Sequence, residues 1–187
     1  MKTKTKKDLR ERILTLLRNQ KKEERLRKST VILGKLFRLK VFKKAKTVFF
    51  YASFDGEVDT FAMIREAQRL GKHIGLPRVK KKDKKIIPVR VYNFKTDMKK
   101  GSYGIKEPKY VRTRMLDLKS LDLVIVPGVA FDKNNHRLGR GVGYYDRFLK
   151  RLPPKVPTIG LAFDFQIIDY LPQKGDHDMV MSKVISN

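Results

Sequence analysis

Short segments rich in β-branched and aromatic residues alternate along this chain with segments whose apolar residues recur at helical spacing. Strands are predicted at residues 47–51, 73–76, 86–94, 121–126, 158–162 and 179–185. Pro77 is expected to end the second strand, and Pro88 places the third at a sheet edge. Helices are predicted at residues 6–40, with a break near Asn19, and at 60–70 behind an Asp59 or Thr60 N-cap. The alternation predicts an α/β fold with a helical N-terminus, in which a mostly parallel sheet forms the middle of three Rossmann-like layers.

The size and composition fit one globular domain, which we expect to span residues 1–187. No apolar run approaches about 18 residues, so no transmembrane helix is predicted. The basic N-terminus has no apolar segment behind it, so a signal peptide is not expected. The absence of cysteine excludes disulfides, thiolate metal sites and a cysteine nucleophile. A cytoplasmic location, with no membrane partner, is the expectation.

The net charge of +26 comes from 45 lysines and arginines against 19 acidic residues. Such a charge fits a nucleic-acid binder, an enzyme that attracts anionic substrates, or a protein adapted to high temperature. The cations are spread over the whole chain, and no helix-turn-helix, zinc-finger or RNP pattern is present. A specific nucleic-acid partner is therefore not expected, although RNA binding through backbone phosphates stays open as the alternative function class.

The segment 137–147 places three alternate glycines, Gly139, Gly141 and Gly143, between arginines and directly before a helix-like run. Glycines allow backbone N–H groups to approach a ligand closely, and guanidinium groups bind phosphate or carboxylate. Asp146 adds an oxygen ligand suited to magnesium. A glycine-rich turn before an ordinary helix is the simpler alternative. Because arginines flank the glycines, a nucleotide phosphate site is favoured, although neither the P-loop nor the Rossmann glycine spacing is present.

Polar segments follow three predicted strands, at residues 52–57, 127–132 and 163–166. Ligands collect beyond the carboxyl ends of parallel strands, so these segments are expected to border a crevice. Glu57 is expected to face it, whereas Asp132 is equally consistent with a turn residue. The aromatic residues expected beside a flat ligand are Tyr51, Tyr144 and Phe131, while Tyr145 is expected to pack into the core. No serine nucleophile motif is present, which argues against a serine hydrolase.

Eight motifs occur in a recognisable order, at residues 6–10, 57–60, 76–78, 103–108, 126–132, 137–146, 166 and 177–178. Together they cover essentially the whole chain, which resembles the 5-formyltetrahydrofolate cyclo-ligase family, also called methenyltetrahydrofolate synthetase. The resemblance implies an ATP- and Mg²⁺-dependent ring closure. ATP phosphorylates the formyl oxygen of 5-formyltetrahydrofolate, N10 attacks the activated carbon, and 5,10-methenyltetrahydrofolate, ADP and phosphate are formed.

The resemblance also implies roles for individual residues. ATP contacts are implied for Lys6, Arg10, Arg137, Leu138, Gly139, Arg140, Gly141, Val142, Gly143, Tyr144 and Tyr145. Folate contacts are implied for Ala52, Glu57, Arg140, Gly141, Val142, Gly143 and Tyr144. Arg140, Tyr144 and Glu57 are implied as catalytic residues, and Asp146 and Asp178 as magnesium ligands. The implied partner is a small folate, with or without a polyglutamate tail, and a monomer is expected. A related ATP-using enzyme with another small acid as substrate stays open.

Overall fold

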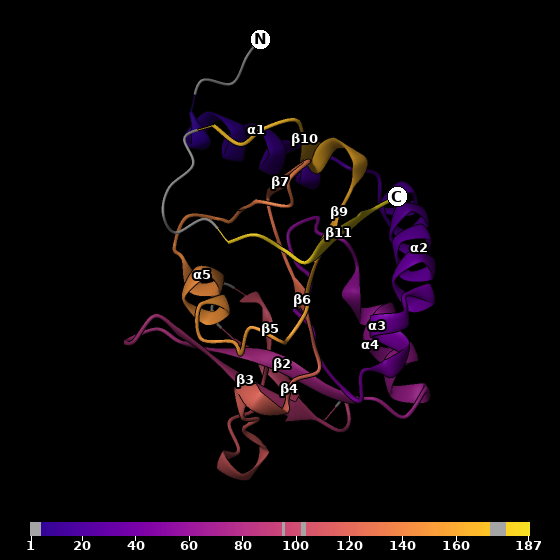
Figure 1. Ribbon diagram of the computed structural model, residues 1–187, viewed down its shortest axis with the longest axis vertical. Coiled ribbons are helices and arrows are strands. Elements are labelled where there is room, and N and C mark those ends of the chain that lie inside the picture. Colours follow the sequence, from indigo (N-terminus) through magenta and orange to yellow (C-terminus); the bar gives the residue numbers. More distant parts are fainter. Residues whose placement is uncertain (1–4, 95, 102–103, 173–178) are drawn as a thin grey trace.

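A six-stranded sheet crosses the molecule, with helices on both of its faces (Figure 1). The computed structural model describes residues 5–94, 96–101, 104–172 and 179–187. Within these residues, no helix combines the length and the apolar character needed to cross a membrane. The arrangement confirms the predicted α/β class with a largely parallel central sheet and a helical N-terminus.

The strand order of the sheet is β11-β9-β6-β1-β2-β3. Its strands are β1 (Thr47–Phe49), β2 (His73–Lys80), β3 (Lys85–Val91), β6 (Leu123–Val126), β9 (Thr158–Ala162) and β11 (Lys183–Ser186). All neighbouring pairs are parallel except β2 and β3. From β1 the chain first extends the sheet towards β2, and then returns to build β6, β9 and β11 on the other side. The order therefore reverses between β1 and β6, and sheets of this kind bind ligands at such a switch point.

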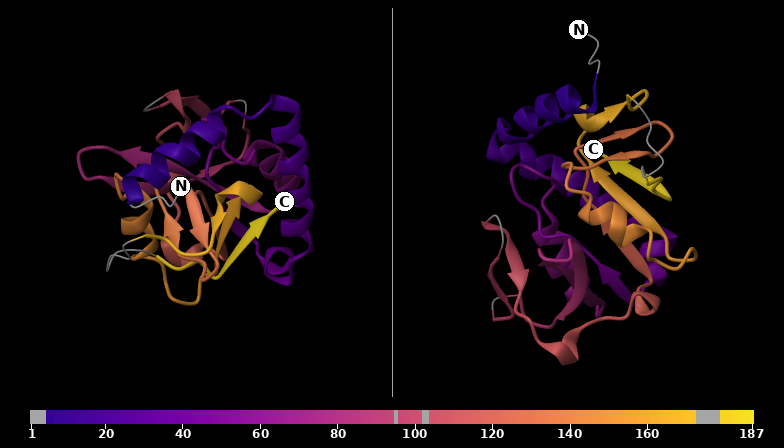
Figure 2. Two further views of the ribbon diagram at one scale, coloured as in Figure 1. Left: turned by 90° about the horizontal axis from the view of Figure 1, so that it is seen from above. Right: turned by 90° about the vertical axis from the view of Figure 1, so that its left-hand side faces the viewer.

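Successive side chains of a strand point to opposite faces of the sheet, so the buried strands contribute to a core on each face. Val48 and Leu123 point to one face, where α1 (Lys6–Arg18), α2 (Lys22–Arg38), α3 (Lys40–Lys44) and α4 (Thr60–Arg69) contribute buried apolar residues. Phe49 and Val124 point to the other face, which is covered by α5 (Tyr144–Leu149) and its neighbouring loops. Figure 2 shows α1 lying across one end of the central strands.

The predicted helix boundaries follow from capping. α1 ends at Arg18, with Asn19 as its C-cap, so the predicted break is confirmed. Asp59 is the N-cap of α4, because its carboxylate accepts the Phe61 N–H at 2.8 Å. Gly71 follows this helix with a φ of +75°, a conformation that suits glycine at a helix C-terminus.

Several predicted strand boundaries were wrong; β3, for example, ends at Val91 rather than at residue 94. Two of the differences have a clear physical reason. Pro77 does not end β2, because it lies opposite Pro88 in the antiparallel pair with β3. The Pro88 carbonyl points to the outer edge of the sheet, where it accepts the Leu116 N–H at 2.9 Å. The two prolines therefore form a pair that exchanges no backbone hydrogen bonds, and their missing N–H groups do not weaken the pairing of β2 with β3. The last strand begins at Lys183 rather than at residue 179. The preceding Met181 instead donates its N–H to the Asn135 carbonyl at 2.8 Å.

Several short elements were not predicted, since two or three residues are too few to show a period. β4 (Met98–Lys100) pairs with β5 (Lys106–Pro108), and β7 (Ala130–Asp132) pairs with β8 (Arg137–Leu138) and β10 (Ile167–Ile168). The charged run at residues 80–85 forms the tip of the β2–β3 hairpin.

Candidate active site

A cavity of about 420 Å³ opens at the carboxyl ends of β1 and β6, at the point where the strand order reverses. Three loops supply most of its wall: residues 51–57 after β1, residues 127–129 after β6, and residues 137–146, which we call the glycine loop. The β2–β3 hairpin and residues 105–107 close the remaining side. The predicted crevice is therefore present, and segments far apart in the sequence meet in it.

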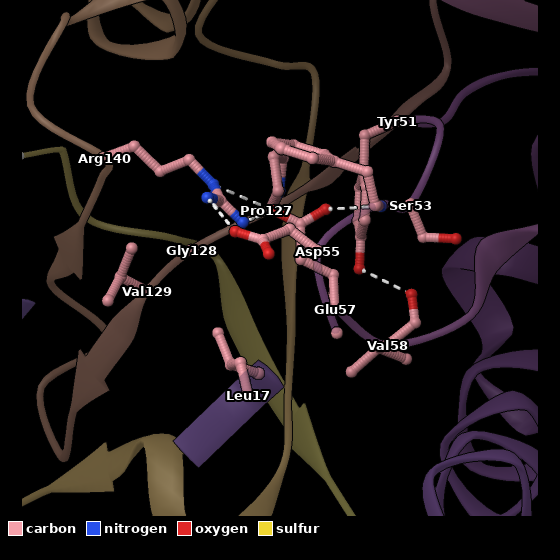
Figure 3. A network of polar contacts seen from close by, with 12 residues as sticks. Leu17, Tyr51, Ser53, Asp55, Glu57, Val58, Pro127, Gly128, Val129 and Arg140 are labelled. Atoms are coloured by element: carbon pink, nitrogen blue, oxygen red, sulfur yellow. Dashed lines mark hydrogen bonds and ion pairs between the residues drawn. The ribbon is translucent and has the colours of Figure 1, made fainter. Parts of the chain in front are cut away.

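Arg140 of the glycine loop joins the loop after β1 through two carboxylates (Figure 3). Its guanidinium donates to Glu57 Oε1 at 3.1 Å and to Asp55 Oδ2 at 2.9 Å. The same guanidinium lies 4.1 Å from the centre of the Phe54 ring. This contact fixes the distance between the two loops, because a planar guanidinium is held on one face by the ring and at its edges by the carboxylates.

Glu57 is buried, with 7% of its surface exposed. Burial raises the pKa of its carboxyl group from 4.5 to about 7, although Arg140 and the backbone N–H of Phe54 act in the opposite direction. Ionised and protonated forms of Glu57 are therefore both populated near neutral pH. A buried carboxyl group with such a pKa is suited to accept or release a proton during a reaction.

The C-terminal end of α1 holds the turn that carries Asp55. Arg18 binds both Asp55 oxygens, at 2.9 and 3.0 Å, and lowers the pKa of this carboxyl group more than any other neighbour does. Gly56 has a φ of +82°, and a Cβ at this position would lie 2.0 Å from the Leu17 carbonyl oxygen. Gln20 donates to the carbonyls of Leu17 and Gly56, both at 3.1 Å. Only glycine permits this close approach of turn and helix.

An earlier turn of α1 contacts the glycine loop. Arg10 donates through Nε to the Gly139 carbonyl at 2.9 Å. Gly141 has a φ of +106°, and a Cβ there would lie 3.7 Å from the Arg10 guanidinium carbon. One helix therefore supports both loops that form the cavity, the glycine loop through Arg10 and the loop after β1 through Arg18.

Arg137 is almost fully buried and connects the glycine loop to the end of β6. Its guanidinium donates to Asp146 Oδ1 at 2.5 Å and to the Pro127 carbonyl at 3.0 Å. The Nε atom of Arg137 and the hydroxyl of Tyr145 are buried without a hydrogen-bond partner among the residues described. Burial raises the pKa of the Tyr145 hydroxyl, which stays protonated. An unpaired buried hydroxyl in the cavity wall is available to a polar group of a ligand.

Most of the predicted site residues lie together in the cavity wall. Those that border it are Ala52, Glu57, Arg137, Gly139, Arg140, Val142, Gly143, Tyr144, Tyr145 and Asp146. Tyr145 also packs against Phe148, as predicted, with ring centres 6.2 Å apart. Within the part of the chain that the structure covers, Lys6, Arg10, Leu138 and Gly141 do not border the cavity. Asp178, like the neighbouring His177, lies outside the described residues.

One open alternative for the crevice is resolved, and two further expectations need correction. Asp132 is a turn residue, since its Oδ1 accepts the N–H groups of Asn134 and His136 at 3.0 and 2.9 Å. Phe131 does not border the cavity. Its ring is buried where Cβ atoms on Gly128 and Gly160 would collide with it.

The second expectation that needs correction concerned the segment after β9, which supports the site rather than lining it. Gln166 donates to the carbonyls of Gly128 and Val129, at 2.9 and 3.0 Å, and so holds the loop after β6. The sequence did not predict Arg18, the hairpin residues Pro77, Val79 and Ile86, or residues 105–107 as parts of the cavity wall. Arg18 carries no local signal, because an arginine in the last turn of a helix is common.

Among the described residues of the cavity wall, Asp146 is the predicted metal ligand. Among the residues described, no group of three or more histidine or acidic side chains could hold a metal ion by itself. Asp146 borders the cavity and carries a carboxylate that Arg137 holds in place. This fits Mg²⁺ that arrives with a nucleotide, because such ions use one or two carboxylates together with phosphate oxygens and water.

Comparison with known proteins agrees with this geometry. The family model described as the 5-formyltetrahydrofolate cyclo-ligase family matches residues 2–187. The mouse 5-formyltetrahydrofolate cyclo-ligase is 34% identical over 188 residues, which cover 96% of this chain and 92% of the mouse protein. The protein of the same name from Haemophilus influenzae is 39% identical over 132 residues, or 70% of each chain.

Two solved structures are similar over nearly the whole chain. The NMR structure of Aquifex aeolicus 5,10-methenyltetrahydrofolate synthetase has a TM-score of 0.84 at 35% identity and covers 96% of this chain and 88% of its own. The 5,10-methenyltetrahydrofolate synthetase from Mycoplasma pneumoniae has a TM-score of 0.77 at 26% identity, with 97% and 98% of the two chains covered. From these matches, this chain belongs to the 5-formyltetrahydrofolate cyclo-ligase family.

Proposed function

We propose that this chain is an ATP-dependent ligase that converts 5-formyltetrahydrofolate to 5,10-methenyltetrahydrofolate, with ADP and phosphate as the other products. The observation that carries the proposal is the contact between Arg140 and Glu57 at the switch point of the sheet. Arg140 belongs to the glycine loop, which we expect to bind phosphate, and Glu57 belongs to the loop after β1. A nucleotide on the first loop and a folate on the second would meet at this pair.

The reaction needs positioning and charge more than it needs a protein nucleophile. The formyl oxygen attacks the γ-phosphorus of ATP, and ADP leaves. N10 of the same folate then attacks the formyl carbon, the bond from that carbon to the phosphorylated oxygen breaks, and phosphate leaves. N10 loses its proton as the methenyl bridge forms. Both reacting groups are on one substrate, so the enzyme contributes electrostatic stabilisation and alignment.

Arg140 is the residue that we expect to contact the transferring phosphoryl group. In the free protein its charge is balanced by Asp55 and Glu57. Asp55 is also bound by Arg18, so this carboxylate keeps a partner when Arg140 turns towards phosphate oxygens. We propose that Arg18 lets Arg140 move towards the phosphate without leaving Asp55 unpaired. An unpaired carboxylate would cost free energy in a partly buried site.

Glu57 is the group that we expect to accept the N10 proton. Its carboxyl group is buried, borders the cavity, and has a pKa raised to about 7. In the ionised form it also holds folate nitrogens by accepting hydrogen bonds. The Tyr145 hydroxyl, unpaired among the described residues, lies in the same wall and can donate to a polar atom of either substrate. Tyr144 is expected to lie beside the folate ring.

The nucleotide is expected to bind across the glycine loop, with Lys6 and Arg10 on the α1 side and residues 139–145 on the cavity side. We propose that Asp146 binds Mg²⁺ carried by the ATP phosphates, with Asp178 as a second candidate. Magnesium bound there would neutralise charge on the phosphates. We further propose a cytoplasmic monomer whose specific partner is the small folate.

The direct test is turnover by the purified protein. With 5-formyltetrahydrofolate, ATP and Mg²⁺, the absorbance of the methenyl product should rise, with one ADP formed for each product molecule. Omission of ATP, or chelation of the metal, should stop the reaction. Folded protein that forms neither product nor ADP over a range of pH and temperature would contradict the proposal. ADP formation with another small acid, and none with the folate, would favour a related ligase instead.

A further inference from the structure

One edge of the sheet exposes large aromatic and apolar side chains that the active site does not use. Tyr92, just after the edge strand β3, is 58% exposed, and Tyr110 is 52% exposed. Met115 is 45% exposed, and its backbone bridges to Val89 of β3. The segment that carries Met115 therefore runs along the outer edge of the sheet.

Arginines lie against both exposed tyrosine rings. The guanidinium carbons of Arg90 and Arg114 are 4.8 and 5.3 Å from the centre of the Tyr92 ring. The guanidinium carbon of Arg78 is 5.4 Å from the centre of the Tyr110 ring. Guanidinium groups close to an aromatic face are attracted to its electrons, so these contacts hold the tyrosines in place while leaving them exposed.

The three arginine–tyrosine contacts belong to one continuous surface. The Tyr110 hydroxyl lies 3.6 Å from the Met115 sulfur, and Met115 directly follows Arg114, which contacts Tyr92. We name this surface the tyrosine–arginine edge; it consists of Arg78, Arg90, Tyr92, Tyr110, Arg112, Arg114 and Met115. None of these seven residues borders the active-site cavity.

A second cavity adjoins the edge and extends its positive charge. It has a volume of about 720 Å³, is bordered by Met115, and carries four basic side chains, those of Lys80, Lys85, Lys119 and Arg151. Its two acidic residues already have partners. Asp83 binds Lys80 at 2.6 Å, and Asp117 accepts the backbone N–H of Lys119 at 2.9 Å. Within the edge, Arg114 forms an ion pair with Asp97 at 2.7 Å. The basic side chains of the edge and the cavity still outnumber these three acidic ones, so together they present exposed rings within a cationic surface.

We propose that the tyrosine–arginine edge binds single-stranded nucleic acid without sequence preference. Unpaired bases stack on exposed aromatic rings and guanidinium planes, and a basic groove follows the backbone phosphates. A duplex keeps its bases stacked inside and could use only the charges. An acidic protein surface would pair with the arginines but leave the two exposed rings without a matching group. The net charge of +26 attracts nucleic acid over a long range, and the two tyrosines determine where on the surface it binds.

The test is fluorescence anisotropy with labelled oligo-dT and oligo-U, for the full chain and its variants. Tyr92→Ala and Tyr110→Ala should each weaken binding about tenfold, since each removes one stacking platform. Tyr170→Ala is the matched control, because Tyr170 is 71% exposed and lies next to β10, outside the edge. It should bind like the wild type. All three variants should keep folate turnover, which shows that they are folded.

Salt dependence gives a second, independent reading. Removing one phosphate contact should reduce the slope of log K against log salt by about 0.7 for a single strand. Arg112→Ala should show this change. Arg38→Ala, on α2 at the β11 side of the sheet, removes the same charge and should not. Equal affinities for all three tyrosine variants, or equal slopes for both arginine variants, would mean that only net charge drives binding and would overturn the proposal. No binding at low salt would also overturn it. Equal or tighter binding of duplex DNA would do the same.

Discussion

Replacing Glu57 with glutamine should flatten the pH dependence of stability between about pH 4.5 and 7. Burial raises the pKa of Glu57 from 4.5 to about 7 in the folded protein, whereas the unfolded chain keeps the ordinary value. Between these two values the native state holds a proton that the unfolded state has released. The free energy of unfolding contributed by Glu57 therefore falls as the pH rises through this window.

The size of the effect follows from the shift. A difference of about 2.5 pKa units corresponds to about 3 kcal/mol, at 1.36 kcal/mol for each unit. Below the window this contribution is fully present, and above about pH 7 it is lost. Glutamine has nearly the same shape as glutamate and does not titrate. The wild type should therefore lose about 3 kcal/mol relative to Glu57→Gln as the pH rises from about 4 to about 8.

Urea denaturation of both proteins across this range measures the difference directly. Subtracting the two curves removes the contribution of every other titrating group, provided that the m-values match. A constant difference at all pH values would show that the Glu57 pKa is ordinary in the folded state. A wild type that gains stability over the variant as the pH rises would show a lowered pKa, and would refute the assignment of Glu57 as proton acceptor.

Other substitutions test the neighbouring contacts. Arg140→Ala should lower kcat by about 100-fold or more, because it removes a preorganised charge from the phosphoryl group; turnover at the wild-type rate would exclude that role. Asp146→Asn should raise the Mg²⁺ concentration needed for half-maximal turnover, and an unchanged titration would remove Asp146 as a ligand. Arg18→Ala should lower kcat more than Arg18→Lys does, since lysine keeps one contact to Asp55; equal loss in both variants, or none, would argue against a positioning role. Gly56→Ala should cost about 3 kcal/mol of stability, against about 1 kcal/mol for Gly71→Ala, where no atom lies within 4 Å of the added Cβ. Equal costs in denaturant would show that the turn can move away from Leu17.

The layers of the fold were predictable because each strand and helix carries its own pattern. β1, β6 and β9 are buried apolar runs, and α1 and α4 have capping residues at their first turns. Pro77 misled the prediction, since its effect depends on the residue opposite it. That residue is another proline from β3, and a single strand contains no information about its partner.

The candidate site was predictable where its residues are continuous in sequence, as in the glycine loop. It was not predictable where a contact depends on folding. Arg18 meets Asp55 only because α1 lies across the ends of the strands, and Gly56 fits only against Leu17. The burial that raises the pKa of Glu57 is likewise a property of the packed structure. Such contacts join residues up to 129 positions apart, as for Arg10 and Gly139.

The most direct test of the proposed chemistry follows one oxygen atom. If the formyl oxygen of 5-formyltetrahydrofolate attacks ATP, that oxygen must leave as part of the phosphate. Folate labelled with ¹⁸O in the formyl group is converted by the enzyme, and the phosphate is analysed by mass spectrometry. We expect one labelled oxygen in the phosphate for each methenyl product formed. Product formation with unlabelled phosphate, and the label found in water, would contradict phosphorylation of the formyl oxygen.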